Sequence, residues 1–511
     1  MAHEALLKEY EARLAKALAG GGAEKYAKRK AAGMWTARER IAALVDEGTF
    51  IESGLFGSSG VYPEQADETQ TDGKLAGFGK INGRDVCLVV NDFTVKGAST
   101  SATNGKKIAH MKRTATEHGM PLVLIGESTG ARLPDAMGSR GMGLLLGNDN
   151  TQFRRTREVP MCAAAFGPAF GSSTWLMCQS DFAIMHKGAV VAVSSPRLVS
   201  MALGEKVDAQ DLGGWRLHAE ITGLVDQVVD QEGEVFEAIK RFLAYLPSHH
   251  REAPPDAPVP AGSGADMDQV LGYLPESRTQ VYDMKRIIRA IADKDTLFEM
   301  KPRFGRSAVT GLARLGGKTV GMVANNPLHR GGALDADACR KIVDFLVLCD
   351  SFNVPIVLLV DTPGFQIGTE AEKAGAPGKI MNFMNAMTLV TVPRISVIIR
   401  KSYGRAYVCM GGGRHSDDVA AWPTAEVSFM SPEFATKIVH GVGPGEPGFE
   451  DAFADIRKGS DVWGLAAVYA AQAVIRPEQT RDYLIRMLEV HRLRMTNGVG
   501  QHLMRTWPTS Y

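Results

Sequence analysis

The chain is predicted to be an α/β protein made of two homologous halves. Each half alternates apolar, strand-like runs with helical patterns and glycine turns, and the two halves repeat each other at a nearly constant offset. Strands that alternate with helices are typical of sheets whose faces are covered by helices. The 511 residues are enough for two or three domains.

The repeat can be followed residue by residue. Asn82-Gly83 is a hairpin signal between two alternating apolar runs, and Gly316-Gly317 stands in the same setting 234 positions later (316 − 82). The same offset relates Lys107 to Lys341, Met120-Pro121 to Val354-Pro355, and Gly130 to Gly364. An offset of 233 (392 − 159) relates Val159-Pro160 to Val392-Pro393 and Gly171 to Gly404. A two-copy repeat of this length indicates duplicated domains.

We expect the two domains to be residues 1–255 and 266–511. Between them, residues 251–265 read REAPPDAPVPAGSGA, and their four prolines favour an extended linker. The first domain is expected to carry a helical N-terminal extension. The second is expected to end in a helix over residues 477–495, where apolar residues recur at helical spacing.

Composition excludes several classes of function. The formal net charge of +1 argues against a nucleic-acid binder held by a broad basic field. The beginning of the sequence has no apolar leader pattern, and the six cysteines include no CxxC pair, so we expect a cytoplasmic protein with buried, reduced thiols. No metal-ligand spacing is present, and we expect no metal site.

Two segments resemble features of other protein classes, a membrane span and a phosphate-binding loop. Residues 159–180 are uncharged and long enough to suggest a membrane span, but their prolines and glycines favour a buried strand, a turn and the start of a helix. Residues 315–319 resemble the end of a phosphate-binding loop. Leu312 stands where that loop needs a glycine, so the segment is predicted to be a hairpin turn.

Each half has two junctions where a strand runs into a glycine turn. They are residues 127–132 and 167–173 in the first half, and residues 361–365 and 403–407 in the second. A strand that enters a helix through small residues leaves free backbone N–H groups at the helix N-terminus, and two of these can form an oxyanion hole for an enolate. The alternative is that the glycines only permit tight turns. Four such turns in register across the repeat favour function.

The sequence then resembles a known family, the carboxyltransferase β subunits of propionyl-CoA carboxylase and related biotin-dependent acyl-CoA carboxylases. The resemblance covers nearly the whole chain, in order. It rests on Thr36–Ile41, Asp46–Phe50, Asp72-Gly73, Asn91–Val95, Gly130–Arg132, Leu212–Gly214, Cys349–Pro355, Pro363–Phe365 and Ala421–Glu426.

This resemblance implies two crotonase-like (ClpP/crotonase) domains and a hexamer built as a trimer of dimers. Each active site would lie between the N-domain of one subunit and the C-domain of a partner. The substrate would be an acyl-CoA, and biotin would arrive on a separate carrier protein or subunit with its biotin carboxylase. The chain would transfer a carboxyl group from carboxybiotin to the α-carbon of the acyl-CoA through an enolate held in backbone oxyanion holes.

Residues carried over from the family fall on the glycine turns. The resemblance implies one oxyanion pair at Gly171 and Ser172 and another at Arg405 and Ala406. Substrate-binding positions are implied at Gly130, Ala131, Gly364, Phe365 and Val408.

Three of these positions depart from the family pattern. Glycine is usual where Ser172 and Arg405 stand, and aspartate is common in propionyl-type enzymes where Val408 stands. Ser172 and Arg405 both keep a backbone N–H, so the oxyanion holes can persist. We expect a more apolar or differently shaped acyl pocket around Val408.

Three other functions stay open. A biotin-dependent decarboxylase or transcarboxylase subunit would use the same half-reaction in reverse. An enoyl-CoA hydratase-like enzyme would need acidic residues at the thioester, and Glu127 and Asp361 precede two of the turns. A non-catalytic assembly subunit is suggested only by Arg405.

Overall fold

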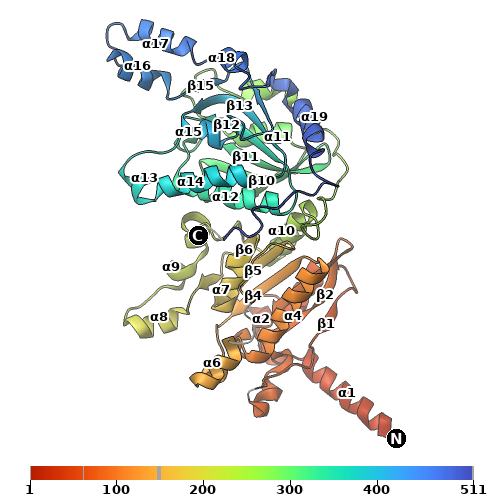
Figure 1. The fold of residues 1–511 in the computed structure, drawn as a ribbon. Coiled ribbons are helices and arrows are strands. Elements are labelled where there is room, and N and C mark those ends of the chain that lie inside the picture. Colours follow the sequence, from red (N-terminus) through yellow and green to blue (C-terminus); the bar gives the residue numbers. More distant parts are fainter. Residues whose placement is uncertain (1, 61, 147–150, 509–511) are drawn as a thin grey trace. The chain divides into compact units, whose positions relative to one another are not determined.

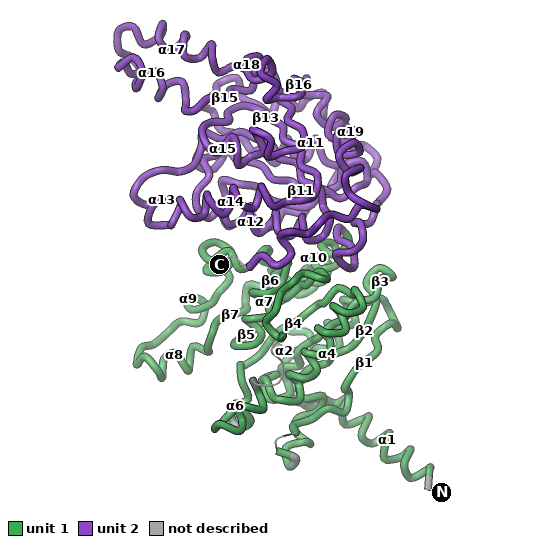
Figure 2. The backbone as a smooth tube through the Cα atoms, in the orientation of Figure 1, with its two compact units in different colours: residues 1–244 green, residues 245–511 purple. Residues whose placement is uncertain are grey.

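The structure is a computed structural model that describes residues 2–60, 62–146 and 151–508. It divides into two compact units, Met1–Ala244 and Tyr245–Tyr511 (Figure 2). Residues 251–265, the predicted linker, lie in the second unit and contain no helix or strand.

The first unit is built on an eight-stranded sheet with the order β1-β2-β3-β4-β5-β6-β8, and β7 pairs with β5 (Figure 1). The β1–β2 and β2–β3 pairings are antiparallel, and the others are parallel. The strands are β1 (Ile51–Ser53), β2 (Lys74–Ile81), β3 (Arg84–Asn91), β4 (Leu122–Ser128), β5 (Met161–Phe170), β6 (Phe182–His186), β7 (Val190–Ala192) and β8 (Gln227–Val229).

The second unit repeats this sheet strand for strand, in the order β9-β10-β11-β12-β13-β14-β16, with β15 paired to β13. Again the first two pairings are antiparallel and the rest parallel. The strands are β9 (Phe298–Met300), β10 (Ala308–Leu315), β11 (Lys318–Asn325), β12 (Ile356–Thr362), β13 (Arg394–Tyr403), β14 (Asp418–Ala421), β15 (Glu426–Ser428) and β16 (Ala473–Val474).

Helices connect the strands in both units. In the first they are α1 (Ala2–Leu18), α2 (Ala23–Ala31), α3 (Ala37–Leu44), α4 (Ala102–His118), α5 (Leu133–Ala136), α6 (Gly138–Leu146), α7 (Ser172–Gln179), α8 (Pro196–Leu203), α9 (Ala209–Gly213) and α10 (Glu232–Tyr245). In the second they are α11 (Met284–Ile291), α12 (Ala336–Ser351), α13 (Thr369–Lys373), α14 (Ala376–Leu389), α15 (Arg405–Cys409), α16 (Pro432–His440), α17 (Phe449–Lys458), α18 (Val462–Ala467) and α19 (Thr480–Arg492). The N-terminal helical extension and the C-terminal helix are as predicted.

The repeat extends to individual contacts. In the first hairpin, the Asp46 carboxylate accepts from the N–H groups of Asn82 and Gly83 at 3.0 and 2.8 Å. In the second, Asp293 accepts from Gly316 and Gly317 at 3.0 and 2.7 Å. A carboxylate that satisfies both turn donors fixes the hairpin in each unit.

A lysine with the same contact also recurs at the predicted pair, half-buried at Lys107 and fully buried at Lys341. Lys107 donates from Nζ to the carbonyl of Lys74, and Lys341 donates to the carbonyl of Ala308 at 2.8 Å. Burial lowers the pKa of Lys107 to about 8 and that of Lys341 to about 7. The two ammonium groups therefore tie the same helix to the same strand in each sheet, and the predicted duplication is present in the fold.

The structure confirms two further interpretations. Residues 159–180 contain the buried strand β5, then Gly171, then α7, and within the described ranges no helix is long and apolar enough to cross a membrane. The segment resembling a phosphate-binding loop is the β10–β11 turn, where Leu315 pairs with Lys318. Five of the six cysteines are buried, and Cys178 is half-buried.

Two signature motifs have structural roles. Thr36 and Glu39 form a reciprocal capping box at the start of α3. Asn353 donates to the carbonyls of His250 and Glu252 at 2.8 and 2.7 Å and accepts from the N–H of Gly500 at 2.8 Å. One amide thus holds the linker and the C-terminal segment against the second unit.

Candidate active site

The two glycine turns of each unit lie side by side. The parallel pairing of β4 with β5 brings their carboxyl ends to one edge of the sheet, and β12 and β13 are paired in the same way. A Cβ atom built on Gly171 would lie 3.7 Å from the Cα of Gly130, and one built on Gly364 would lie 3.8 Å from the carbonyl of Tyr403. The predicted turn residues are therefore neighbours in space.

Gly171 and Gly404 begin the helices that follow the long central strands. Gly171 has φ 63° at the N-cap of α7, and Gly404 has φ 62° at the N-cap of α15. Only glycine adopts this conformation without strain next to the following helix, and the tight reversal points the first-turn N–H groups out of the sheet edge.

The first-turn donors are free. No acceptor among the described residues bonds the N–H groups of Ser172, Ser173, Arg405 or Ala406. The Gly404 N–H is occupied, because it donates to the carbonyl of Ser428 at 3.0 Å. No acceptor among the described residues bonds the N–H of the predicted donor Gly171, so the first unit has this N–H in addition to the two equivalent donors that follow each N-cap. Sequence reasoning missed Ser173, although the repeat itself, shifted by 233 (406 − 173), pairs it with Ala406.

A cleft of about 630 Å³ opens beside the α7 turn in the first unit. It brings together three predicted site residues, Ala131, Gly171 and Ser172. Its other walls come from α4, from residues 151–153 and from the exposed Trp175 of α7. A cleft with free N–H groups at its edge and an apolar wall is suited to a thioester with a long carrier group.

Three basic side chains line this cleft at helical spacing. Lys106, His110 and Arg113 lie on one face of α4 and are exposed. The spacing of four and three residues stacks them along a single stripe. Such a stripe attracts phosphate groups, and Arg113 can bind them with a bidentate fork.

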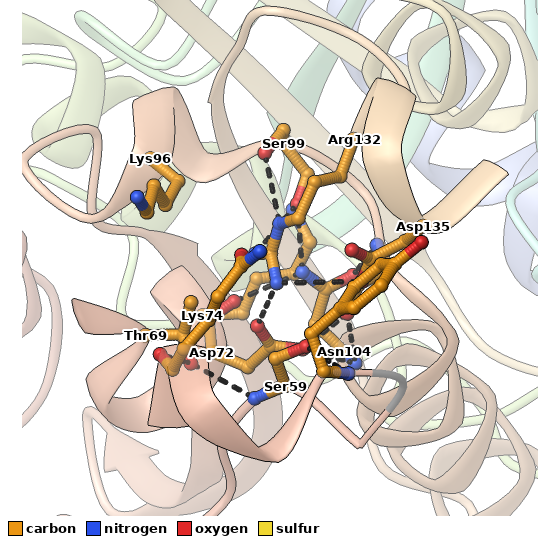
Figure 3. Close-up of polar contacts among 12 residues, drawn as sticks. Ser59, Thr69, Asp72, Lys74, Lys96, Ser99, Asn104, Arg132 and Asp135 are labelled. Atoms are coloured by element: carbon orange, nitrogen blue, oxygen red, sulfur yellow. Dashed lines mark hydrogen bonds and ion pairs between the residues drawn. The ribbon is translucent and has the colours of Figure 1, made fainter. Parts of the chain in front are cut away.

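A buried polar cluster includes residues adjacent in sequence to Thr100 and Ala131, which line the cleft (Figure 3). The Arg132 guanidinium binds the Asp72 carboxylate at 2.6 Å and donates to the Oγ and carbonyl of Ser99 at 3.2 and 3.3 Å. Asp72 also accepts from the hydroxyl of Ser101 and from the N–H of Asn104 at 3.1 Å. Burial lowers the pKa of the neighbouring Lys74 to about 7. These contacts fix the backbone of residues 99–101.

The second unit presents a different turn surface. The side chain of Arg405 is exposed, and no described carboxylate forms an ion pair with it. Val408 is half-buried on the same helix, and Phe365 pairs with Leu334 in a short parallel bridge. The exposed Phe429 lies beside the turn, because its carbonyl would be 3.1 Å from a Cβ built on Gly404.

Glu127 and Asp361 are held in buried ion pairs. Glu127 contacts Arg29 at 2.5 Å and Arg40 at 3.1 Å, and all three side chains are buried. Asp361 binds Arg400 at 2.9 Å and accepts from the hydroxyl of Tyr282 at 2.9 Å. Burial and the Asp361 charge raise the pKa of Tyr282 well above its usual value, so it remains a donor. Both carboxylates are therefore occupied by structural partners.

Comparisons with known proteins agree with this geometry. The family model described as "Carboxyl transferase domain" matches residues 28–497. The propionyl-CoA carboxylase beta chain of Roseobacter denitrificans is 34% identical over 86% of this chain and 87% of its own length. The methylmalonyl-CoA decarboxylase subunit alpha of Veillonella parvula is 32% identical over 93% of this chain and 94% of its own length.

A solved structure of the transcarboxylase 12S hexamer core, with methylmalonyl-coenzyme A and methylmalonic acid bound, is similar along 95% of both chains. Its TM-score is 0.89 and its sequence identity is 29%. The two parallel-rich units thus have the crotonase-like fold, and the protein is a carboxyltransferase. It belongs to the carboxyl transferase family, with the carboxyltransferase subunits of acyl-CoA carboxylases.

We expect Glu127→Gln to destabilise the protein by about 3–5 kcal/mol, because it leaves the buried Arg29 guanidinium without its carboxylate partner. Glu237→Gln, which disrupts an exposed pair with Lys240 at 3.2 Å, should change stability by at most about 1 kcal/mol. Thermal unfolding of both variants measures the difference. A Glu127→Gln protein with unchanged stability and no activity would instead assign Glu127 to the chemistry.

Proposed function

We propose that this chain transfers a carboxyl group between carboxybiotin and the α-carbon of an acyl-CoA, as the carboxyltransferase subunit of an acyl-CoA carboxylase. The observation that carries this proposal is the first-unit cleft, in which free N–H groups, an apolar wall and a basic stripe occur together. The acyl-CoA would lie in this cleft, with Gly130 and Ala131 in the turn beside its thioester. Its phosphates would lie on Lys106, His110 and Arg113.

The second unit would receive the biotin group. The free N–H groups of Arg405 and Ala406 fit a ureido carbonyl oxygen, and Gly364, Phe365 and the exposed Phe429 lie around the same turn. Biotin, when bound, supplies the carboxyl group and accepts the α-proton. The chain's own contribution is to orient the thioester and to stabilise charge that develops on its oxygen. Each donor removed would cost on the order of 3 kcal/mol of that stabilisation.

Assembly into a hexamer is part of the proposal. The transcarboxylase relative is described as a hexamer, and two equivalent helices here, α8 and α16, expose apolar side chains. Met201 and Leu203 are 71% and 66% exposed, and Ile438 and Val439 are 58% and 64% exposed. Exposed apolar faces of this kind mark association surfaces. A separate biotin carboxylase and biotin carrier would complete an ATP-dependent ligase, and the buried thiols support a cytoplasmic location.

The proposal is tested with the purified chain, its biotin carboxylase partner and carrier, ATP, bicarbonate and a panel of acyl-CoA substrates. We expect biotin-dependent carboxylation of at least one acyl-CoA. Biotin-dependent loss of CO2 from methylmalonyl-CoA without net carboxylation would assign the decarboxylase direction instead. Hydration of crotonyl-CoA in the absence of biotin would contradict the proposal.

The basic stripe gives a separate prediction. Combining Lys106→Ala with Arg113→Ala should raise the KM for acyl-CoA by about tenfold or more, because two charge-assisted contacts to phosphates are lost. The KM for the corresponding acyl-pantetheine, which lacks those phosphates, should not change. Lys80→Ala, in the β2–β3 hairpin, is the control. Equal effects on both substrates would contradict binding of the CoA phosphates by Lys106 and Arg113.

The family resemblance implies that Val408, although it lies on α15 of the second unit, also lines the acyl pocket, so it should affect which acyl group is accepted. In Val408→Asp we expect kcat/KM to fall more for the longest acyl-CoA accepted than for propionyl-CoA, because a carboxylate disfavours apolar contact. Val490→Asp on α19, a partly exposed position remote from the turns in sequence, is the matched control. An unchanged substrate ranking would count against a role for Val408 in the acyl pocket.

A further inference from the structure

Two hydroxyl groups face each other in the first-unit cleft. The Oγ1 of Thr100 lies 2.7 Å from the Oγ of Ser172, and both residues line the cleft. The pair has two hydroxyl protons, and the bond between them uses one. Among the described residues no other acceptor bonds either hydroxyl, so one proton is available to a ligand.

The backbone of Thr100 is fixed by its own hydrogen bonds and by those of its two neighbours. Its N–H donates to the Gly130 carbonyl and its carbonyl accepts from the Arg132 N–H, both at 2.8 Å. Its two neighbours are fixed by the buried cluster, Ser99 by Arg132 and Ser101 by Asp72 (Figure 3). Because the backbone cannot move and a β-branched side chain has few rotamers, the hydroxyl has a defined position.

The second unit shows that the turn itself does not require this arrangement. It makes the same ladder, with the Leu334 N–H donating to Gly364 at 3.0 Å and the Gln366 N–H donating to Leu334 at 2.8 Å. Yet Thr100 is replaced there by Leu334, and Ser172 by Arg405. The counterparts of Arg132, Asp72, Ser99, Ser101 and Asn104 are Gln366, Arg306, Ala333, Asp335 and Ala338.

The buried cluster and the hydroxyl pair are therefore features of the first unit alone. A polar cluster that is costly to bury, and that the duplicated fold omits elsewhere, points to a task at this cleft. The cleft offers one task that needs a rigid donor, which is binding the thioester oxygen.

We propose that the Ser172 hydroxyl is an additional donor to the thioester oxygen, beside the free N–H groups of the α7 turn. Thr100 donates its proton to the Oγ of Ser172, which leaves the Ser172 proton directed at the substrate. Ser172 is then a catalytic residue through its side chain, and Thr100 is a positioning residue. This inference rests on the proposed function, because it takes acyl-CoA as the occupant of the cleft.

The step balances without proton transfer by either hydroxyl. When the bond from the α-carbon to hydrogen or to the carboxylate breaks, its electron pair moves toward the thioester oxygen. The Ser172 hydroxyl gives that oxygen a hydrogen bond that strengthens as the charge grows. The donor therefore acts mainly on kcat and little on KM.

The test uses the full chain with methylmalonyl-CoA or malonyl-CoA and free biotin, and follows carboxyl loss from the CoA ester. Ser172→Gly and Ser172→Ala remove the hydroxyl but keep the backbone N–H. Both should lower kcat by on the order of 10²-fold with KM little changed. Thr100→Val should lower kcat less, and Thr100→Ser should restore it. Thr103→Val removes a hydroxyl from the first turn of α4, at a position that does not line the cleft, and should have no effect.

Each outcome bears on one proposal. A wild-type chain that transfers no carboxyl group would overturn the proposed function. An active wild type with an equally active, equally stable Ser172→Gly would overturn only the role of the hydroxyl. A loss confined to KM, or a Thr100→Ser variant as impaired as Thr100→Val, would also overturn it. Thermal unfolding of each variant separates these results from misfolding.

Discussion

The parallel pairing of two neighbouring strands determines the rest of this structure. In a parallel pair both carboxyl ends meet at one edge, so the loop after β4 and the loop after β5 must share the same space. The backbone donors released there have no partner in the sheet. A turn with free main-chain N–H groups is thus a direct product of strand direction, and the same pairing of β12 with β13 produces a second such turn.

The duplicated sheet separates what the fold needs from what each half does. Both units keep the carboxylate that holds the hairpin, the lysine that donates to the strand carbonyl and the positive-φ glycine before the helix. They differ in the side chains placed around that glycine. The first unit surrounds it with hydroxyls beside a buried ionic cluster, while the second exposes a guanidinium and an aromatic ring. The shared contacts therefore belong to the fold, and the differences are confined to the side chains around the turns.

Local and periodic signals in the sequence were sufficient for much of the fold. Strand alternation, the hairpin at Asn82 and the strand–turn–helix over residues 159–180 depend on residues close together in the chain. The glycines at positions 171 and 404 could be found for the same reason. The family resemblance, not the periodicity, supplied the reaction.

Contacts between distant residues could not be predicted in this way. Arg29 meets Glu127 across 98 positions, and Thr100 meets Ser172 across 72. Only the packing of the helical extension and of α4 against the sheet brings them together. Glu127 therefore looked available for chemistry in the sequence, although it is fully paired. Ser173 was overlooked because the resemblance implied Gly171 and Ser172 in the first half but Arg405 and Ala406 in the second. At the repeat offset, the counterparts of Arg405 and Ala406 are Ser172 and Ser173.

The two turns have a consequence for how such enzymes diversify. Because each is encoded by its own copy of the repeat, a substitution at Ser172 leaves Arg405 untouched, and the reverse also holds. Substitutions can then accumulate in one turn while the other turn stays unchanged. A single polypeptide that carries both copies also fixes their ratio at one to one, so neither turn can be lost through unequal expression.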